Sequence, residues 1–250
     1  MEGYTALAPF YDRFVGADYQ KIIDFINRKI NKYCPEASIV CDIGCGSGTV
    51  TLALADLGYD MIGIDGSYDM LNEAIGKKSM AAGGDRALFL CQELPEFELY
   101  GTVGAIISTL DTVNYITDKE ALDRLFYWFR NYLDPDGLLI FDINSLYKYE
   151  SVLGNNCDIY EDDAVFMTWK SRFDFPICSH ELSVFEREDD CYYRSDEDQT
   201  QRYYSIDEIK ALLEKYQFDL LEIVDDYSEN KPSDQSERIT IVAQVRKDSI

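Results

Sequence analysis

The segment VCDIGCGSG, residues 40–48, passes from an apolar run directly into a turn that contains Gly44, Gly46 and Gly48. Glycine has no Cβ, so a turn of this composition lets the backbone come close to a bound molecule. A helical stretch follows at once, and the first amides of a helix can donate hydrogen bonds to an anionic group. The segment therefore predicts a strand, a ligand-binding turn and a helix in that order.

The next apolar run, YDMIGID at residues 59–65, ends in Asp65. At this place in a nucleotide-binding βαβ unit, a carboxylate accepts hydrogen bonds from ribose hydroxyls and would repel the 2′-phosphate of NADP. An NAD-binding site is the closest alternative, but its fingerprint is Gly-x-Gly-x-x-Gly, whereas this turn reads GCGSG. Asp42, just before the glycines, suits a cationic amino group. A glycine turn that serves packing alone is the second alternative, and the complete order of features disfavours it.

Short apolar runs recur along the chain with helical stretches between most of them, which indicates parallel strands joined by crossover helices. An amphipathic helix over residues 18–33, with Asp18 as its N-cap, precedes them. Thr117–Glu120 and Ser205–Glu208 have the spacing of capping boxes and predict two further helix starts. The runs are SIVCDI (38–43), YDMIGID (59–65), ALFLC (87–91), VGAIIST (103–109), LLIFDI (138–143), LLEIV (220–224) and RITIVAQV (238–245).

Residues 145–204 interrupt this alternation with aromatic and β-branched segments that are typical of antiparallel strands. We interpret them as an inserted β-rich lid that either binds substrate or forms the subunit interface of a homodimer. Residues 1–144 and 205–250 then form one α/β domain around the glycine turn. The predicted fold class is α/β, a doubly wound sheet with an inserted antiparallel β lid.

The composition of the chain limits the classes of molecule that it is expected to bind. The chain has 23 Lys and Arg against 47 Asp and Glu, a formal net charge of −24. Such a molecule repels nucleic acid and anionic membrane surfaces and favours neutral or cationic substrates. The sequence has no apolar run long enough to span a membrane and no signal-peptide pattern at its N-terminus, so we expect a cytoplasmic protein. The cysteines lack Cys-x-x-Cys spacing, so neither a metal site nor a disulfide framework is expected.

These residues resemble the class I S-adenosylmethionine-dependent methyltransferases, whose motif after the first strand is similar to CDIGCGSG. The resemblance covers nearly the whole chain and is strongest to the small-molecule branch that includes sugar N,N-dimethyltransferases and glycine N-methyltransferases. It implies a Rossmann-like sheet of seven strands. The other matching segments are LCQELPEF (90–97), STLDTVNYI (108–116) and LDPDGLLIFDINS (133–145).

The resemblance implies a cofactor, S-adenosylmethionine, with S-adenosylhomocysteine as product. Asp42 and the glycine backbone would hold its methionine end, Asp65 its ribose, and Gln92 with Glu93 its adenine. Tyr11 and Tyr19 would lie over the sulfonium, although Tyr19 also fits the apolar stripe of its helix. The implied cofactor-binding residues are Tyr11, Tyr19, Asp42, Gly44, Cys45, Gly46, Asp65, Gly66, Met70, Gln92, Glu93 and Thr109.

The acceptor is expected at the carboxyl ends of the strands, where doubly wound sheets bind their ligands. Candidate acceptor-binding residues there are Asp111, Asn114, Tyr115 and Asn144. A protonated amine cannot attack a methyl group, so the candidates for catalysis are Asp111, Tyr115 and His180. Each has a structural alternative: a strand-end Asp also caps loops, and a lone His in a lid is often an ordinary strand residue.

The function expected from these observations is transfer of a methyl group from S-adenosylmethionine to a nitrogen or oxygen of a small metabolite. The sulfonium makes the methyl electrophilic, so alignment of the reacting atoms and exclusion of water are the protein's main contributions. The alternative is a non-catalytic protein that binds S-adenosylmethionine and acts as a regulatory or interaction module.

Overall fold

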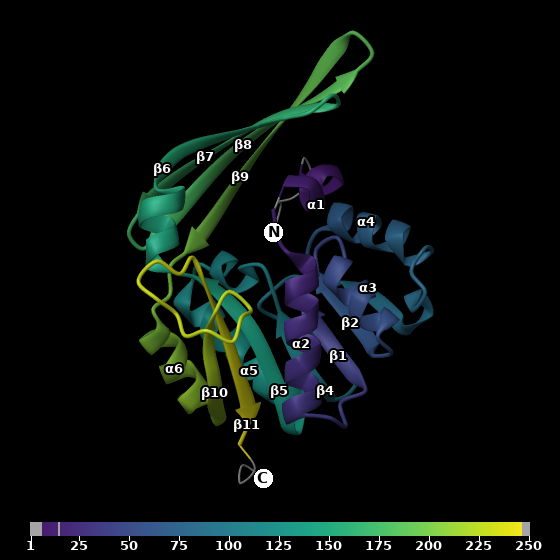
Figure 1. Ribbon diagram of the computed structural model, residues 1–250, viewed down its shortest axis with the longest axis vertical. Helices are drawn as coiled ribbons and strands as arrows, with labels where there is room; N and C mark the ends of the chain where they lie inside the picture. The colour runs from purple at the N-terminus through teal and green to yellow at the C-terminus, as the bar shows by residue number, and fades with distance from the viewer. Residues whose placement is uncertain (1–6, 15, 247–250) are drawn as a thin grey trace.

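The apolar runs around the glycine turn lie side by side in one seven-stranded sheet of the computed structural model, which describes residues 7–14 and 16–246 (Figure 1). Branched apolar side chains fill both faces of these short runs, as is usual for strands that are covered by helices on both sides. The strands are β1 (Ile39–Ile43), β2 (Asp60–Asp65), β3 (Ala87–Cys91), β4 (Val103–Ser108), β5 (Leu133–Asn144), β10 (Phe218–Asp225) and β11 (Arg238–Val245).

The strand order is β10-β11-β5-β4-β1-β2-β3. Strands β1 to β5 pair in parallel, whereas β11 is antiparallel to both β5 and β10. The chain winds outward from β1 to β3 and then returns to the other side of β1 with β4. In open α/β sheets this reversal point, at the carboxyl ends of the central strands, is where ligands bind.

Helices cover both faces of the sheet. On one face α5 and α6 pack against residues such as Ile106, and on the other face α2 and α3 pack against residues such as Ile107. Neighbouring residues of β4 therefore enter opposite cores, as the two-residue period of a strand requires. The helices are α1 (Tyr11–Phe14), α2 (Tyr19–Tyr33), α3 (Thr49–Asp56), α4 (Tyr68–Lys78), α5 (Lys119–Tyr132) and α6 (Ile206–Lys215), with single turns η1 (Ala8–Phe10), η2 (Gly84–Arg86), η3 (Thr112–Tyr115) and η4 (Lys148–Leu153).

Two of the three expected helix starts are confirmed. Asp18 caps α2 by accepting a hydrogen bond from the Lys21 amide, and Ser205 with Glu208 forms a complete capping box at α6. The capping box predicted at Thr117–Glu120 is wrong. Asp118 caps α5 instead, because its carboxylate accepts the Ala121 amide at 2.8 Å.

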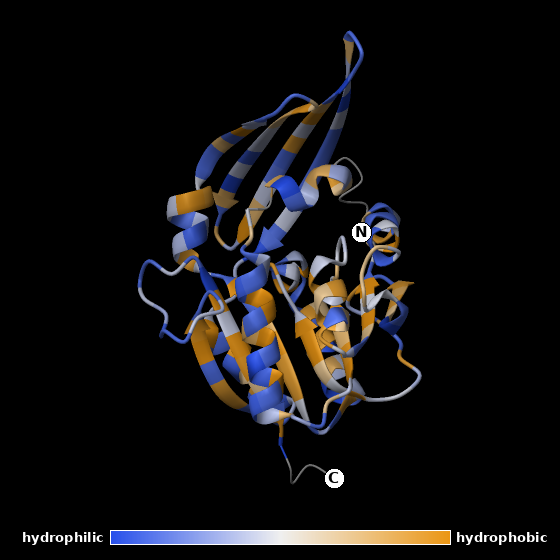
Figure 2. Ribbon diagram, turned by 45° about the vertical axis from the view of Figure 1, so that its right-hand side comes forward, coloured by the Kyte–Doolittle hydropathy of each residue, from blue (hydrophilic) through white to orange (hydrophobic). Residues whose placement is uncertain are grey.

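A second sheet, antiparallel and four-stranded, lies within the segment 145–204. It arches over the carboxyl edge of the first sheet, with α1 beneath it (Figure 1). Hydropathy alternates along its strands (Figure 2), and Val165, Met167, Leu182 and Val184 form a small core with Leu7 and Phe10. Its strands are β6 (Asn155–Glu161), β7 (Val165–Asp174), β8 (Ile177–Glu188) and β9 (Cys191–Arg202).

The expected fold class, a doubly wound α/β sheet with an antiparallel β insertion, is thus confirmed. Within residues 7–14 and 16–246, no helix is both long enough and apolar enough to cross a membrane. In the same residues, no group of His, Cys, Asp or Glu side chains is arranged to hold a metal ion.

Candidate functional site

The glycine turn lies between the end of β1 and the start of α3. Gly44 and Gly46 have φ values of +72° and +53°, a left-handed backbone that favours glycine. A Cβ on Gly44 would lie 2.3 Å from the Thr112 side chain, and one on Gly46 would lie 3.0 Å from the Met70 methyl. Glycine is therefore required at both positions by backbone conformation, and at Gly44 also by space.

Asp65 holds this turn in place. One carboxylate oxygen accepts the Gly46 amide and the other accepts the Ser67 amide, each at 2.8 Å. Burial raises the pKa of Asp65, and these amide hydrogen bonds oppose the rise by stabilising the charged form. The acid at the end of β2 thus joins the glycine turn to the first turn of α4.

A cleft opens above these residues at the carboxyl ends of β1, β2 and β4. It contains about 750 Å³ of empty space, a volume that includes the open solvent at its mouth. The expected cofactor residues that line it are Tyr11, Tyr19, Gly44, Cys45, Gly46, Asp65, Gly66, Met70 and Thr109. The lining residues that the sequence did not single out for the cofactor are Ser47, Thr49, Val50, Ser67, Leu94, Leu110, Thr112 and Tyr115.

Three expected cofactor residues do not line the cleft. Gln92 uses its side chain to bond the main chain of Glu98, donating at 3.2 Å and accepting at 2.7 Å, so it shapes the loop after β3. Glu93 lies next to the cleft wall, because a Cβ on Gly66 would be 3.7 Å from its Cγ. Leu94, one residue further on, supplies the lining side chain instead.

Asp42 is the third. It is buried below the glycine turn, where Thr51 donates to one carboxylate oxygen at 2.6 Å. The other oxygen, Oδ1, is buried and has no hydrogen-bond partner within residues 7–14 and 16–246. Burial raises the pKa of Asp42 to about 7, with the nearby charge of Asp65 acting in the same direction and the Thr51 hydrogen bond opposing it. An unsatisfied buried carboxylate oxygen is costly, so this atom points to a cationic or donor group in the bound state.

Tyrosine rings form the wall of the cleft that comes from the N-terminal helices. Tyr19, at the start of α2, donates from its hydroxyl to Asp12 at 2.7 Å. Burial raises the pKa values of Tyr11 and Tyr19, so both phenols stay neutral. A neutral aromatic ring keeps the negative face that attracts a cation.

Asp12 ties this wall to the glycine turn, a contact that no sequence pattern indicated. Its carboxylate accepts hydrogen bonds from Ser47 at 2.8 Å and Thr49 at 3.0 Å, and it forms an ion pair with Lys77. Burial works against the charged form of Asp12, but the hydrogen bonds from Lys77 and Tyr19 hold its pKa below the ordinary value. The wall and the turn are thus held by one ionised group.

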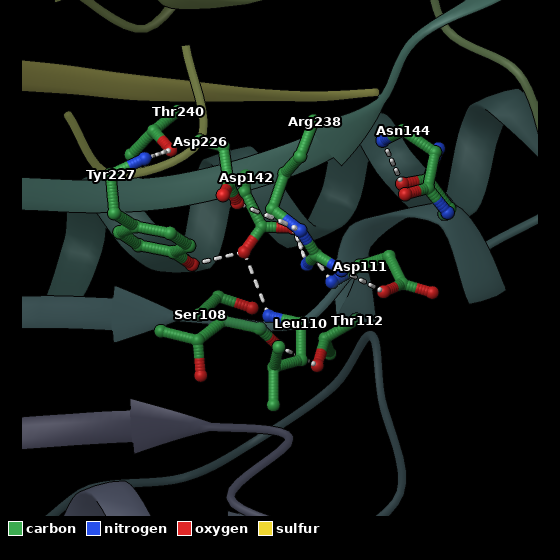
Figure 3. A network of polar contacts seen from close by, with 12 residues as sticks. Ser108, Leu110, Asp111, Thr112, Asp142, Asn144, Asp226, Tyr227, Arg238 and Thr240 are labelled. Carbon is green, nitrogen blue, oxygen red and sulfur yellow. Dashed lines mark hydrogen bonds and ion pairs between the residues drawn. The ribbon is translucent and has the colours of Figure 1, made fainter. Parts of the chain in front are cut away.

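The floor of the cleft at the end of β4 is a strained turn. Leu110 and Asp111 have φ values of +56° and +59°, which are uncommon for residues with side chains. Their amides donate to the two carboxylate oxygens of Asp142, each at 2.7 Å. Figure 3 shows that Tyr227 and Arg238 also contact this carboxylate, the latter at 2.8 Å. Asp142, at the end of β5, therefore holds the turn in its left-handed conformation.

Asp111 is fully engaged by its neighbours. Arg238 approaches one carboxylate oxygen at 3.1 Å, and Gln201 of β9 donates to the other at 2.6 Å. The side chain does not line the cleft. Both carboxylate oxygens of Asp111 therefore have partners from other elements, and the side chain connects the turn to β9. Its role in catalysis stays a prediction.

Tyr115 lines the cleft and is oriented by β9. A carboxylate only accepts hydrogen bonds, so the amide NH₂ of Gln199 must face Glu197, at 2.5 Å. The Gln199 carbonyl oxygen then faces Tyr115, whose hydroxyl donates to it at 2.9 Å. The direction of the Tyr115 O–H bond is thereby fixed from the second sheet.

Asn114 and Asn144 are buried outside the cleft. The side-chain NH₂ of Asn114 donates to the Arg202 carbonyl at 2.8 Å, and its side-chain oxygen accepts the backbone N–H of Asn144 at 2.9 Å. Asn114 therefore joins the ends of β5 and β9. The Asn144 side chain donates to Gln201 at 3.2 Å, and its Oδ1 lies buried without a partner. The structure brings both residues into the joint between the two sheets rather than to the cleft surface.

His180 lies in the second sheet, on β8. Its Nδ1 accepts the indole N–H of Trp169 at 3.1 Å and lies 2.9 Å from the Ser171 hydroxyl. Because an indole only donates, Nδ1 carries the lone pair and Nε2 carries the proton of the neutral ring. Burial lowers the pKa of His180 to about 4. Its lone pair is thus occupied and the residue does not line the cleft, so the structure does not bring His180 to the place where a general base was expected.

The chain is similar to known proteins over nearly its whole length. A family model described as "Methyltransferase domain" matches residues 11–223. A protein of Geobacillus sp. (strain WCH70) named "Putative methyltransferase" is 31% identical over 248 residues, which cover 96% of this chain and 98% of the relative.

Solved structures have the same fold. An S-adenosylmethionine-dependent methyltransferase from Clostridium acetobutylicum ATCC 824 superposes with a TM-score of 0.87 at 33% identity and covers 96% of this chain and 98% of its own. The sugar N-methyltransferase KedS8 from Streptoalloteichus sp. ATCC 53650 has a TM-score of 0.80 at 18% identity, over 98% of this chain and 94% of its own. At that identity the second similarity concerns the fold alone.

Proposed function

The chain belongs to the class I S-adenosylmethionine-dependent methyltransferases, and we propose that it transfers a methyl group from S-adenosylmethionine to a nitrogen or oxygen of a small metabolite. The observation that carries this proposal is the cleft at the reversal point of the sheet, where the glycine turn and Asp65 are bonded to each other. S-adenosylhomocysteine is the expected product.

The residues of the cleft fit this cofactor. When bound, it supplies an electrophilic methyl group on a positively charged sulfur. Asp65 has further lone pairs on its amide-bonded oxygens and lies where ribose hydroxyls can donate to it. The unpartnered Oδ1 of Asp42 can be satisfied by the ammonium of the methionine end, directly or through a water molecule. Met70 and Leu94 give an apolar surface for the adenine.

The aromatic wall contributes to the reacting end. Tyr11 and Tyr19 line the cleft with neutral rings, whose faces attract a sulfonium. Together with Leu110 and Tyr115 they exclude water from the place where the methyl group would lie. Enclosure of this kind fixes the line of attack, which is the main source of rate acceleration in a simple displacement.

The chain's contribution to catalysis is positioning. Asp111 and His180 are both committed to other groups, so we propose that the acceptor arrives as a neutral nucleophile and that its surplus proton passes to solvent after transfer. Tyr115, held by Gln199, is the side chain proposed to orient the acceptor beside the cleft.

The segment 145–204 is proposed to be the acceptor lid. Its inner face places Gln199 and Gln201 on Tyr115 and Asp111, next to the cleft, and both glutamines are buried. Polar side chains turned toward the site favour a role in covering a polar small molecule over a role as a subunit interface. The domain that binds the cofactor is then formed by residues 1–144 and 205–250.

A methyl-transfer screen tests the proposal. The protein is incubated with methyl-labelled S-adenosylmethionine and a fractionated extract of cell metabolites, and transfer of label to a small molecule is measured. Calorimetry with S-adenosylhomocysteine is run beside it. Absence of S-adenosylhomocysteine binding by folded protein would reject the cofactor site, whereas binding without transfer to any fraction would favour the non-catalytic alternative.

A further inference from the structure

A second cavity adjoins the cofactor cleft. Leu110 lines both spaces, so the strained turn at the end of β4 is their common wall. The second cavity holds about 1,220 Å³ of empty space out to its mouth and is mainly polar. Its walls come from the start of α2, from Lys148 in η4, and from the segment between β10 and β11 together with Arg238.

Charged groups line this cavity, and two of its three lining cations, Lys21 and Arg238, form ion pairs. Lys21 forms an ion pair with Asp226 at 2.6 Å, and Arg238 pairs with Asp142 and Asp111. Asp18 caps α2. These side chains neutralise one another within the wall.

Lys148 is the exception. It has no ion pair in the part of the chain that the structure describes, although its side chain is partly buried at the cavity wall. Burial lowers the pKa of Lys148, and the charge of Arg238 lowers it further. The carboxylates of Asp111, Asp142 and Glu237 act on this ammonium from beyond ion-pair distance, so an anionic group of a ligand can still pair with it directly.

The other acidic residues that line the cavity limit the negative charge that the anion can carry. Asp225 and Glu237 also line the cavity, and neither forms an ion pair within residues 7–14 and 16–246. They would repel a ligand with several negative charges, and they can accept hydrogen bonds from amine or hydroxyl groups. The cavity therefore fits a molecule with one anionic group and further polar donors.

We propose that the second cavity binds the methyl acceptor through one anionic group, a carboxylate or a phosphate, that pairs with Lys148. This inference rests on the methyl-transfer function proposed above. The nucleophile of the acceptor then lies toward Leu110, where the two cavities meet, and the anionic group lies at η4. Because the whole chain is strongly acidic, this one unpaired ammonium decides whether an anionic acceptor is retained.

Calorimetry on the complex with S-adenosylhomocysteine tests the assignment without knowledge of the acceptor. Inorganic phosphate and acetate are titrated separately at constant ionic strength. We expect wild-type protein to bind at least one of them with millimolar affinity, and Lys148→Gln to weaken that binding at least about tenfold. Lys148→Arg, which keeps the charge, should bind within a few-fold of wild type. Lys231→Gln is the matched control, since Lys231 is an exposed lysine between β10 and β11.

The outcomes separate this inference from the function on which it rests. Binding of phosphate alone supports a phosphate ester, and binding of acetate supports a carboxylate. Failure of both probes to bind wild type, or equal binding by Lys148→Gln, overturns the assignment of the cavity. If S-adenosylhomocysteine binds in those cases, the methyl-transfer proposal stands; if it does not bind, that proposal fails as well.

Discussion

The acidic residues around the cleft have different structural roles, and their hydrogen-bond partners distinguish these roles. Asp65 and Asp142 each accept two backbone amides and hold a turn. Asp12 joins helix side chains to the glycine turn. Asp42 alone among these has a buried oxygen without a partner. The partners therefore show which carboxylates hold turns and helices together, a role that does not exclude the ribose contact proposed for Asp65.

At Asp42 the expected consequence is pH-dependent binding. Its pKa of about 7 means that roughly half of the free protein has a protonated carboxyl at neutral pH. An ammonium beside Asp42 favours the ionised form, so S-adenosylhomocysteine should bind more tightly as the pH rises through 7. Near pH 7 about half a proton should be released on binding. Calorimetry in buffers of different ionisation enthalpy measures this release.

Asp42→Asn is the control for that proton. The amide cannot titrate, so its binding should lose the pH dependence around 7 and release no proton. An equal proton release from Asp42→Asn and wild type would show that another group is responsible.

Asp65→Ala removes both the proposed ribose contact and the link between the turn and α4. We expect S-adenosylhomocysteine affinity to fall by about 1–3 kcal/mol, the range for a hydrogen bond to a charged group or for leaving a buried donor unpaired. Asp60→Ala is the matched control at the exposed start of the same strand, where Asp60 pairs only with Arg86. Titration calorimetry compares them, and unchanged affinity in Asp65→Ala would remove this residue from the proposed site.

Among the elements, the turn after β4 depends most on distant parts of the chain. Leu110 and Asp111 are left-handed, and the groups that stabilise them come from β5, from the loop after β10 and from β11. Within STLDTVNYI the Thr112 hydroxyl donates to the Thr109 carbonyl at 2.9 Å, but the acceptor of the Leu110 and Asp111 amides comes from β5. The floor of the cofactor cleft is thus a property of the sheet edge and not of the motif.

Tyr227→Phe tests this support. The buried Asp142 carboxylate loses a hydroxyl donor, so the free energy of unfolding should fall by about 1–3 kcal/mol. Tyr216→Phe is the control, because Tyr216 donates to Asp123 at 2.7 Å from a partly exposed position. The free energy of unfolding should fall less in Tyr216→Phe than in Tyr227→Phe. Chemical denaturation measures both, and equal losses would mean that the Asp142 network has no special weight.

On the scale of the whole molecule, β9 couples the second sheet to the reaction site. Gln199 contacts Tyr115, Gln201 contacts Asp111, and the Arg202 carbonyl accepts from Asn114. The inward-facing residues of β9 therefore contact Tyr115, Asp111 and Asn114 at the edge of the first sheet. Movement of the second sheet would therefore change the orientation of Tyr115, which lines the cleft.

Gln199→Leu should separate turnover from cofactor binding. Tyr115 loses the acceptor that fixes its hydroxyl, so we expect kcat with the acceptor found in the screen to fall by about tenfold, within the range that misplacement of a positioning group produces. The affinity for S-adenosylhomocysteine should not change. Thr200→Val, the next residue on the exposed face of β9, should behave as wild type. Parallel losses of turnover and cofactor affinity in Gln199→Leu would contradict this role.

Much of the fold could be predicted from local patterns. The apolar runs became strands of the expected sheet, and Asp18 and Ser205 cap helices as their spacing indicated. The error at Thr117 has a local cause as well, since Asp118 is a competing cap one residue later. Periodicity and caps act over a few residues, so they can be read without the tertiary structure.

The sequence by itself determined the strand–turn–helix unit at residues 40–48, the acid that ends β2 and the antiparallel insertion, because each depends on neighbouring residues and on side-chain periodicity. Only the tertiary structure decided which polar residues face the cleft. Asp111 is occupied by Arg238 and Gln201, which lie far away in sequence, and His180 by Trp169 of the neighbouring strand. Whether a side chain is available for chemistry depends on the partners that packing brings to it, and those contacts are not encoded in local spacing.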